Sequence, residues 1–128
     1  MDKLQNILQM MLGNTFVMYF KAHTYHWNVE GANFSELHSF FGGIYEDLHD
    51  AVDVIAEEMR AMDFYAPISI MEMYNTKTIK EDTEKPADAK AMLVNLQDAN
   101  EKVIDTLNKL FDSATKAGQQ GLANFAAD

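Results

Sequence analysis

The chain contains no cysteine among its 128 residues, so disulfide bonds and thiolate metal sites are excluded. Basic residues are scarce as well: 10 Lys and Arg stand against 20 Asp and Glu, which gives a formal net charge of −10. Non-specific nucleic-acid binding depends on neutralising phosphates, so this charge disfavours DNA as a partner. A negative field attracts cations instead, although an acidic surface serves ordinary solubility equally well.

Long apolar runs are also missing. No stretch of about 18 apolar residues, the length that a membrane-spanning helix needs, occurs in the sequence. Polar residues interrupt the first apolar run too early for a secretory signal. We therefore expect no membrane segment and a cytoplasmic location.

Only two prolines interrupt the chain, and its apolar residues recur mostly at helical spacing. The pattern predicts an all-α fold with helices over residues 2–29, 33–62, 69–74 and 86–116. A further helical pattern begins at Leu122, but the sequence stops at Asp128 with room for about two turns. We expect residues 1–128 to form one domain, a four-helix bundle with a short helix in a connection and a truncated or very short last helix.

Several residues predict where these helices begin and end. Asn33–Glu36 and Ser69–Glu72 have the form of a capping box, an N-cap acceptor with Glu three residues later. Pro67 breaks the chain after the second long helix, and Pro86 fits the first turn of the next one. Gly13 lies inside the first helix, where glycine costs about 1 kcal/mol relative to alanine.

Four potential metal ligands form two groups. His26 and His38 can meet across the short turn between the first two helices, and Asp53 and Glu57 lie one turn apart and can share an ion. Imidazoles and carboxylates are typical ligands of iron and other divalent metals. His38 and Asp53 are 15 residues apart, about 22 Å on a straight helix, so no single ion can touch both. A second copy of the chain is therefore expected to complete each site.

A polar stripe on the second helix contains these ligands and flanks a continuous apolar stripe. Its members are His38, Gly42, Glu46, His49, Asp53 and Glu57. We expect the apolar stripe to face the core of the chain and the polar stripe to face another subunit. Glu46 and His49 are weaker ligand candidates. Asp53 and Glu57 could instead be a plain solvated pair, although like charges at this spacing repel and a bound cation would relieve them.

The same residues stand in a longer pattern. The motif H-W-x-V-x-G-x-N-F-x-x-L-H runs from His26 to His38, and D-x-x-A-E runs from Asp53 to Glu57. With these motifs the sequence resembles the Dps family, the starvation-protection mini-ferritins of the ferritin-like superfamily. The resemblance covers residues 21–61 and extends to the order of the helices, including the short one in the connection.

The resemblance implies a ferritin-like bundle that assembles through two-fold dimers into a dodecameric shell. It implies an iron site at the dimer interface, with His26 and His38 from one chain and Asp53 and Glu57 from its mate, beside the aromatic Trp27. The implied activity is that of a ferroxidase, an oxidoreductase that oxidises Fe(II) with hydrogen peroxide or dioxygen. The Fe(III) product would be stored in the hollow shell.

The sequence departs from the family pattern in two respects. The family usually has Asp one turn after His38, where this chain has Gly42, so at least one iron position is expected to be weak. Lysine-rich tails bind DNA in some members, but only Lys3 precedes Lys21 here, so DNA binding is not carried over. One alternative stays open: a ferritin-like structural or assembly subunit with a degraded metal site, built into a larger particle.

Overall fold

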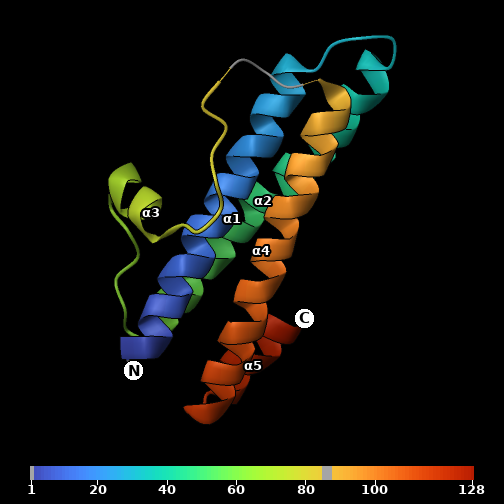
Figure 1. Ribbon diagram of the computed structural model, residues 1–128. Coiled ribbons are helices and arrows are strands. Elements are labelled where there is room, and N and C mark those ends of the chain that lie inside the picture. Colours follow the sequence, from blue (N-terminus) through green and yellow to red (C-terminus); the bar gives the residue numbers. More distant parts are fainter. Residues whose placement is uncertain (1, 85–87) are drawn as a thin grey trace.

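The computed structural model describes residues 2–84 and 88–128, and this part of the chain contains helices and no strand (Figure 1). The helices are α1 (Asp2–Asn28), α2 (Phe34–Ala61), α3 (Ile70–Thr76), α4 (Ala89–Lys116) and α5 (Gln120–Ala127). The all-α prediction is confirmed. α3 is the short helix expected in the connection between α2 and α4, and α5 is the expected short last helix.

The helix α1 lies at the centre of the arrangement. It packs against α2, α3 and α4, whereas α5 packs against α4. In Figure 1 the three long helices run side by side, and α5 lies beside the C-terminal end of α4. The 8 residues of α5 extend only about 12 Å, so in the described residues the fourth position of the bundle is filled over part of its length.

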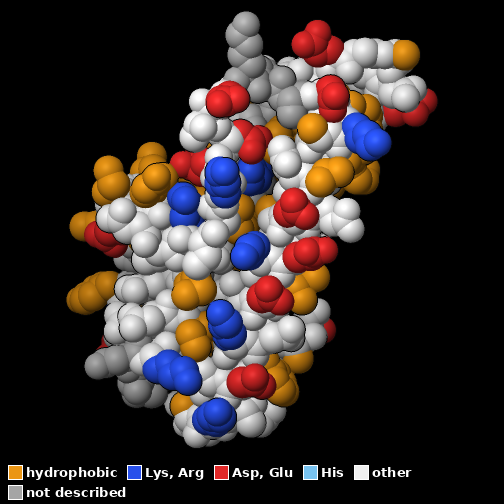
Figure 2. All heavy atoms as spheres, viewed as in Figure 1, with side chains coloured by type: hydrophobic (Ala, Val, Ile, Leu, Met, Phe, Trp, Pro, Cys, Tyr) orange, Lys and Arg blue, Asp and Glu red, His pale blue; other side chains and the backbone are white. Residues whose placement is uncertain are grey.

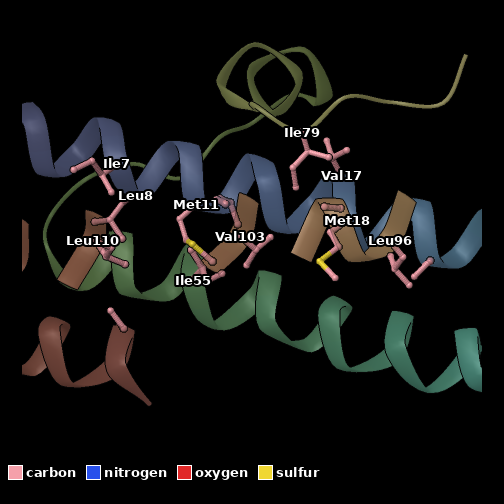
Figure 3. Close-up of a cluster of buried hydrophobic side chains, with 14 of the residues drawn as sticks. Ile7, Leu8, Met11, Val17, Met18, Ile55, Ile79, Leu96, Val103 and Leu110 are labelled. Carbon is pink, nitrogen blue, oxygen red and sulfur yellow. The ribbon is translucent and has the colours of Figure 1, made fainter. Parts of the chain in front are cut away.

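The core is built from the inner faces of the long helices. Leu8, Leu12, Phe41, Met59 and Leu110 are almost completely shielded from water. Figure 3 shows side chains from α1, α2 and α4 meeting in one cluster. The predicted apolar stripe of α2 faces this cluster. Burying one large hydrophobic side chain contributes about 1.5–3 kcal/mol, so this core is the main source of helix packing energy.

Gly13 lies where α3 comes close to α1. A Cβ atom at this position would lie 2.5 Å from Oγ1 of Thr76 and 2.8 Å from the carbonyl oxygen of Met73. Both distances are far below van der Waals contact, and the Met73 oxygen belongs to the backbone and cannot turn away. The poor helix propensity of glycine is therefore tolerated because only glycine lets the end of α3 pack directly on α1.

Asn14 fastens the connection after α3 to the bundle. Its buried side-chain oxygen accepts hydrogen bonds from the backbone amides of Thr78 and Ile79, at 2.6 and 3.1 Å. Its side-chain nitrogen donates to the hydroxyl oxygens of Thr78 and of Thr106 on α4, at 2.8 and 3.2 Å. One side chain of α1 thus links two segments that lie 64 and 92 residues away in the sequence.

A second link joins the same connection to α1 farther along. The buried Lys21 forms an ion pair with Asp82, with 2.8 Å between Nζ and Oδ1. The hydroxyl of Tyr25 donates to the other carboxylate oxygen of Asp82. Burial and this hydrogen bond raise the pKa of Tyr25 above its ordinary value. The phenol therefore stays protonated and remains a donor, which holds the connection along α1.

The two predicted capping boxes differ in outcome. Ser69 caps α3 as predicted, because its side chain accepts a hydrogen bond from the amide of Glu72 at 3.2 Å. Asn33 precedes α2, but its side chain makes no capping hydrogen bond. Its φ of −99° and ψ of 25° are not the extended conformation that an N-cap needs, so the capping box predicted at Asn33 is wrong.

The start of α4 also differs from the prediction. The helix begins at Ala89, and Asp88 caps it by accepting a hydrogen bond from the amide of Ala91 at 2.8 Å. Pro86, predicted to lie in the first turn, is outside the described residues. Asp88 supplies the stronger start signal because its carboxylate satisfies an amide that the first turn leaves unpaired.

Hydrophobic side chains are exposed on α3 and on the segment that leads into it. Tyr65, Ile68, Ile70 and Met71 keep 80, 92, 75 and 65% of their surface accessible. Figure 2 shows hydrophobic side chains gathered along the edge of the molecule where α3 lies. A group of this kind is typical of a surface that contacts another molecule. Across the described residues, no helix has the length and apolarity that crossing a membrane requires.

Candidate metal centre

The turn between α1 and α2 brings two predicted ligands together. His26 lies in the last turn of α1, and His38 lies early in α2. Gly31 between them has a φ of 110°, which residues with a side chain rarely adopt, and it lets the chain reverse within a few residues. The two imidazole rings stack with their centroids 3.6 Å apart and their planes inclined by 20°. The structure therefore places both imidazoles at the end of the α1–α2 pair where the two helices are joined.

The two histidines also exchange hydrogen bonds with each other's backbone. Nδ1 of His26 lies 2.6 Å from the carbonyl oxygen of His38, and Nδ1 of His38 lies 2.7 Å from the carbonyl oxygen of His26. A carbonyl only accepts, so each Nδ1 carries a proton, and Nε2 is the ring nitrogen left for binding a metal. Metal-binding histidines typically have this arrangement, in which the second nitrogen is oriented by a backbone carbonyl. In both rings Nε2 is thus the potential ligand atom.

Gly42 lies one turn after His38 and is buried against His26. A Cβ atom at Gly42 would lie 3.3 Å from both Cε1 and Nδ1 of the His26 ring. That contact is tight, and the ring would have to move by a few tenths of an ångström to accept a side chain. The absence of a side chain at Gly42 therefore gives His26 its position against α2.

Asp53 and Glu57 are exposed one turn apart near the other end of α2. The charge of Asp53, together with a hydrogen bond between the two side chains, raises the pKa of Glu57 above its ordinary value. Their one-turn spacing on α2 places the two carboxyl groups close enough to repel each other when both are ionised. A divalent cation held between them would remove this repulsion.

The histidine pair and the carboxylate pair remain separate within one chain. α2 is continuous from Phe34 to Ala61, so the 15 residues between His38 and Asp53 span about 22 Å. Among residues 2–84 and 88–128, no three His, Asp or Glu side chains come close enough to hold one ion. The separation of the two pairs is compatible with a site shared by two subunits. The shared site stays a prediction.

Glu46 and His49, the weaker ligand candidates, lie between the two groups on α2. Both are exposed, and they border a surface depression together with Tyr19, Tyr45 and Asp50. The ring of His49 lies 5.2 Å, centroid to centroid, from that of Tyr19. Both candidates therefore face solvent on the side of α2 that was predicted to meet a second subunit.

Sequence reasoning missed an aromatic cluster around His23. The His23 ring stacks on Tyr45 with 3.9 Å between centroids and lies 4.2 Å from the Trp27 ring. Its Nδ1 is 2.9 Å from the hydroxyl of Tyr19. Burial is the main cause that lowers the pKa of His23, and the charges of neighbouring imidazoles, that of His26 first, lower it further. The available signal was the spacing of Tyr19, His23 and Trp27, which puts three rings on one face of α1.

Comparison with known proteins first defines the class. The family model described as a ferritin-like domain matches residues 5–128. The Dps protein of Vibrio cholerae O1 has the same fold, with a TM-score of 0.93 and 29% identity over 99% of this chain and 79% of that one. Its structure is described as that of a member of a broad superfamily of ferritin-like diiron-carboxylate proteins. The molecule is thus a ferritin-like four-helix bundle.

Sequence relatives narrow this class. An uncharacterised low temperature-induced protein of Nostoc is 34% identical over 122 residues, which cover 94% of this chain and 68% of that protein. A DNA protection during starvation protein of Helicobacter pylori is 25% identical over 122 residues, 95% of this chain and 85% of its own. The chain belongs to the Dps family of the ferritin-like superfamily.

Proposed function

We propose that the protein is a ferroxidase of the Dps type that oxidises Fe(II) at a site shared by two subunits. His26 and His38 of one chain and Asp53 and Glu57 of its mate bind the iron. The product, Fe(III), is stored inside a shell of identical subunits, with twelve copies as the expected number. The reaction uses hydrogen peroxide as the oxidant in preference to dioxygen.

The observation that carries this proposal is the state of the histidine pair. Both imidazoles are fixed by backbone carbonyls through Nδ1, which leaves Nε2 as the potential ligand atom in each of two stacked rings. Fixing a side chain by hydrogen bonds is costly unless the resulting geometry serves packing or binding. Here it presents two neutral ligands at the surface, whereas the two carboxylates that would balance an iron charge lie at the far end of the same helix.

An antiparallel pair of α2 helices brings the two groups together. A two-fold axis near Tyr45–Asp47 would place His38 of one chain beside Asp53 and Glu57 of the other. The polar stripe is exposed along this stretch, as such a contact requires. The exposed hydrophobic side chains on and before α3 support assembly into a larger particle.

Each group has a chemical task in the proposed reaction. Two Fe(II) ions lose one electron each and together reduce one hydrogen peroxide, whose O–O bond breaks. With two protons taken from the solution, its oxygen atoms leave as two water molecules. The carboxylates stabilise the rising charge of Fe(III), because oxygen anions bind the harder ion more strongly. The imidazoles hold the ions in place without adding charge.

A second candidate function is that of a structural subunit with a degraded metal site. Gly42 favours it, because the family position one turn after His38 normally supplies a carboxylate. In that case the chain would assemble normally but would not accelerate iron oxidation. The two candidates therefore differ in rate and not in fold.

The test compares the native assembly with the double variant Asp53→Ala/Glu57→Ala. Rates of Fe(II) oxidation by peroxide are measured at matched salt and pH, because the acidic surface attracts cations in any case. The control is Glu101→Ala/Asp105→Ala, which removes two exposed carboxylates one turn apart on α4, away from the proposed axis, and changes the charge equally. We expect the first pair to abolish the accelerated oxidation and the control to retain it. A native rate no higher than that of Asp53→Ala/Glu57→Ala would favour the structural subunit.

A further inference from the structure

The pair Gly42–Gly43 is not fully explained by the single chain. Two glycines inside α2 cost about 2 kcal/mol relative to two alanines. Gly42 has a local reason, since its bare backbone accommodates the His26 ring. Gly43 has none: a Cβ atom there would meet nothing within 4 Å, and the residue is exposed. Gly43 therefore leaves a notch in the outer surface of α2, next to the histidine pair.

The proposed two-fold arrangement determines what faces this notch. With the axis at Glu46, the centre of the range Tyr45–Asp47, each residue of α2 lies opposite the one equally far on the other side of the centre. His49 of the partner subunit then lies opposite Gly43. Moving the axis by one residue either way shifts this register by two residues, about 3 Å, so the notch stays within reach of the imidazole.

The same register places the other groups consistently. His49 precedes Asp53 by one turn on the same stripe, so the two side chains approach the neighbouring subunit together. Asp53 of the partner subunit lies opposite Ser39, which is adjacent to His38. A metal ion beside His38 would thus meet the partner's Asp53 on one side and the partner's His49 toward Gly42. His49 is exposed in the single chain and free to make this contact.

We propose that His49 of the partner subunit enters the notch at Gly43 and supplies a nitrogen ligand in place of the carboxylate that the family pattern has at Gly42. This inference rests on the proposed shared site and assigns its missing ligand. An imidazole is longer than an aspartate side chain, so it needs the empty space beside Gly43. Imidazole nitrogen binds Fe(II), Co(II) and Zn(II) well, so the second metal position is complete and not degraded.

The test measures metal binding without oxidation, by titrating Co(II) into the metal-free assembly of the full chain. Calorimetry gives affinity and stoichiometry, and the visible Co(II) spectrum reports its nitrogen ligands. We expect His49→Ala to weaken one of the two positions at least about tenfold, the loss that even supporting groups of a metal site cause. The same variant should change the spectrum. Asp50→Ala and His23→Gln are the controls for charge and for the loss of an imidazole elsewhere, and both should titrate as the native protein does.

Gly43→Leu provides a second variant that keeps every imidazole. Its side chain points into open space in the single chain, so folding should persist, as circular dichroism and assembly mass would verify. In the assembly it fills the notch, and it should weaken the same Co(II) position as His49→Ala does. If both variants bind Co(II) like the native protein while Asp53→Ala/Glu57→Ala does not, the role of His49 is wrong and the shared site stands. If the native protein binds no Co(II) more tightly than Asp53→Ala/Glu57→Ala, the shared site itself fails.

Discussion

Replacing Asn14 by leucine should destabilise the protein by about 3 kcal/mol. The Asn14 side-chain oxygen is the acceptor for the backbone amides of Thr78 and Ile79. Ile79 is 2% exposed, so its amide would lose its partner with little access to water, at a cost of about 1–3 kcal/mol. Thr78 is exposed, and its amide can turn to solvent at a smaller cost. Thr106 keeps its bond to the carbonyl oxygen of Lys102 and adds little.

Urea unfolding at matched protein concentration measures the loss, because the proposed assembly would stabilise the folded chain by an amount that grows with the logarithm of concentration. Hydrogen exchange at the amide of Ile79 should accelerate much more than exchange in the middle of α1, which locates the effect. Asn28→Ala is the control: its side-chain nitrogen donates a hydrogen bond to the carbonyl oxygen of Thr24, but on the exposed surface. It should change the unfolding free energy by less than about 0.5 kcal/mol. If Asn14→Leu changes the unfolding free energy by no more than this control does, and hydrogen exchange at Ile79 is unchanged, the reasoning is refuted.

The remaining predictions concern single positions. Gly13→Ala should destabilise by about 1–3 kcal/mol despite the better helix propensity, because the methyl group collides with the α3 backbone; thermal unfolding would reveal a gain if the contact were loose. Since Asp53 raises the pKa of Glu57, the metal-free chain loses stability as pH rises through that pKa. Glu57→Gln should therefore be more stable than the native chain near neutrality and equal to it in acid, as unfolding at two pH values would show. Gly42→Asp alone should not raise Fe(II) oxidation, whereas Gly42→Asp with His49→Ala should; equal rates of the two would count against the partner's imidazole.

Sequence periodicity was sufficient for α2 and α4 because each buries a regular apolar stripe, whereas α1, which packs on three helices, is buried on several sides. The stripe on α2 from Leu37 to Met62 predicted both the helix and its inward face. The capping box at Asn33 failed because capping depends on the backbone angles of one residue, which the neighbouring turn at Gly31 sets. The four-residue sequence motif of a capping box does not determine the conformation of that turn.

The candidate site was predictable in part. The closeness of His26 and His38 followed from the short turn between two helices. Their exchange of hydrogen bonds with each other's carbonyl groups did not, because it depends on the angle at which α1 and α2 pack. The hydrogen bonds by which Asn14 holds the connection after α3 against α1 could not be predicted either, since its partners lie 64 and 92 residues away in the sequence. Contacts of this kind become evident only when the helices are placed in space.

The separation of the two ligand pairs along α2 has a kinetic consequence. If each site needs the histidines of one chain and the carboxylates of another, a lone chain has no complete site. At concentrations below the dimer dissociation constant, the number of sites grows with the square of the chain concentration. Iron oxidation would then be second order in protein when dilute and first order once assembly is complete. Newly made chains would stay inert toward iron and peroxide until a shell is there to receive the product.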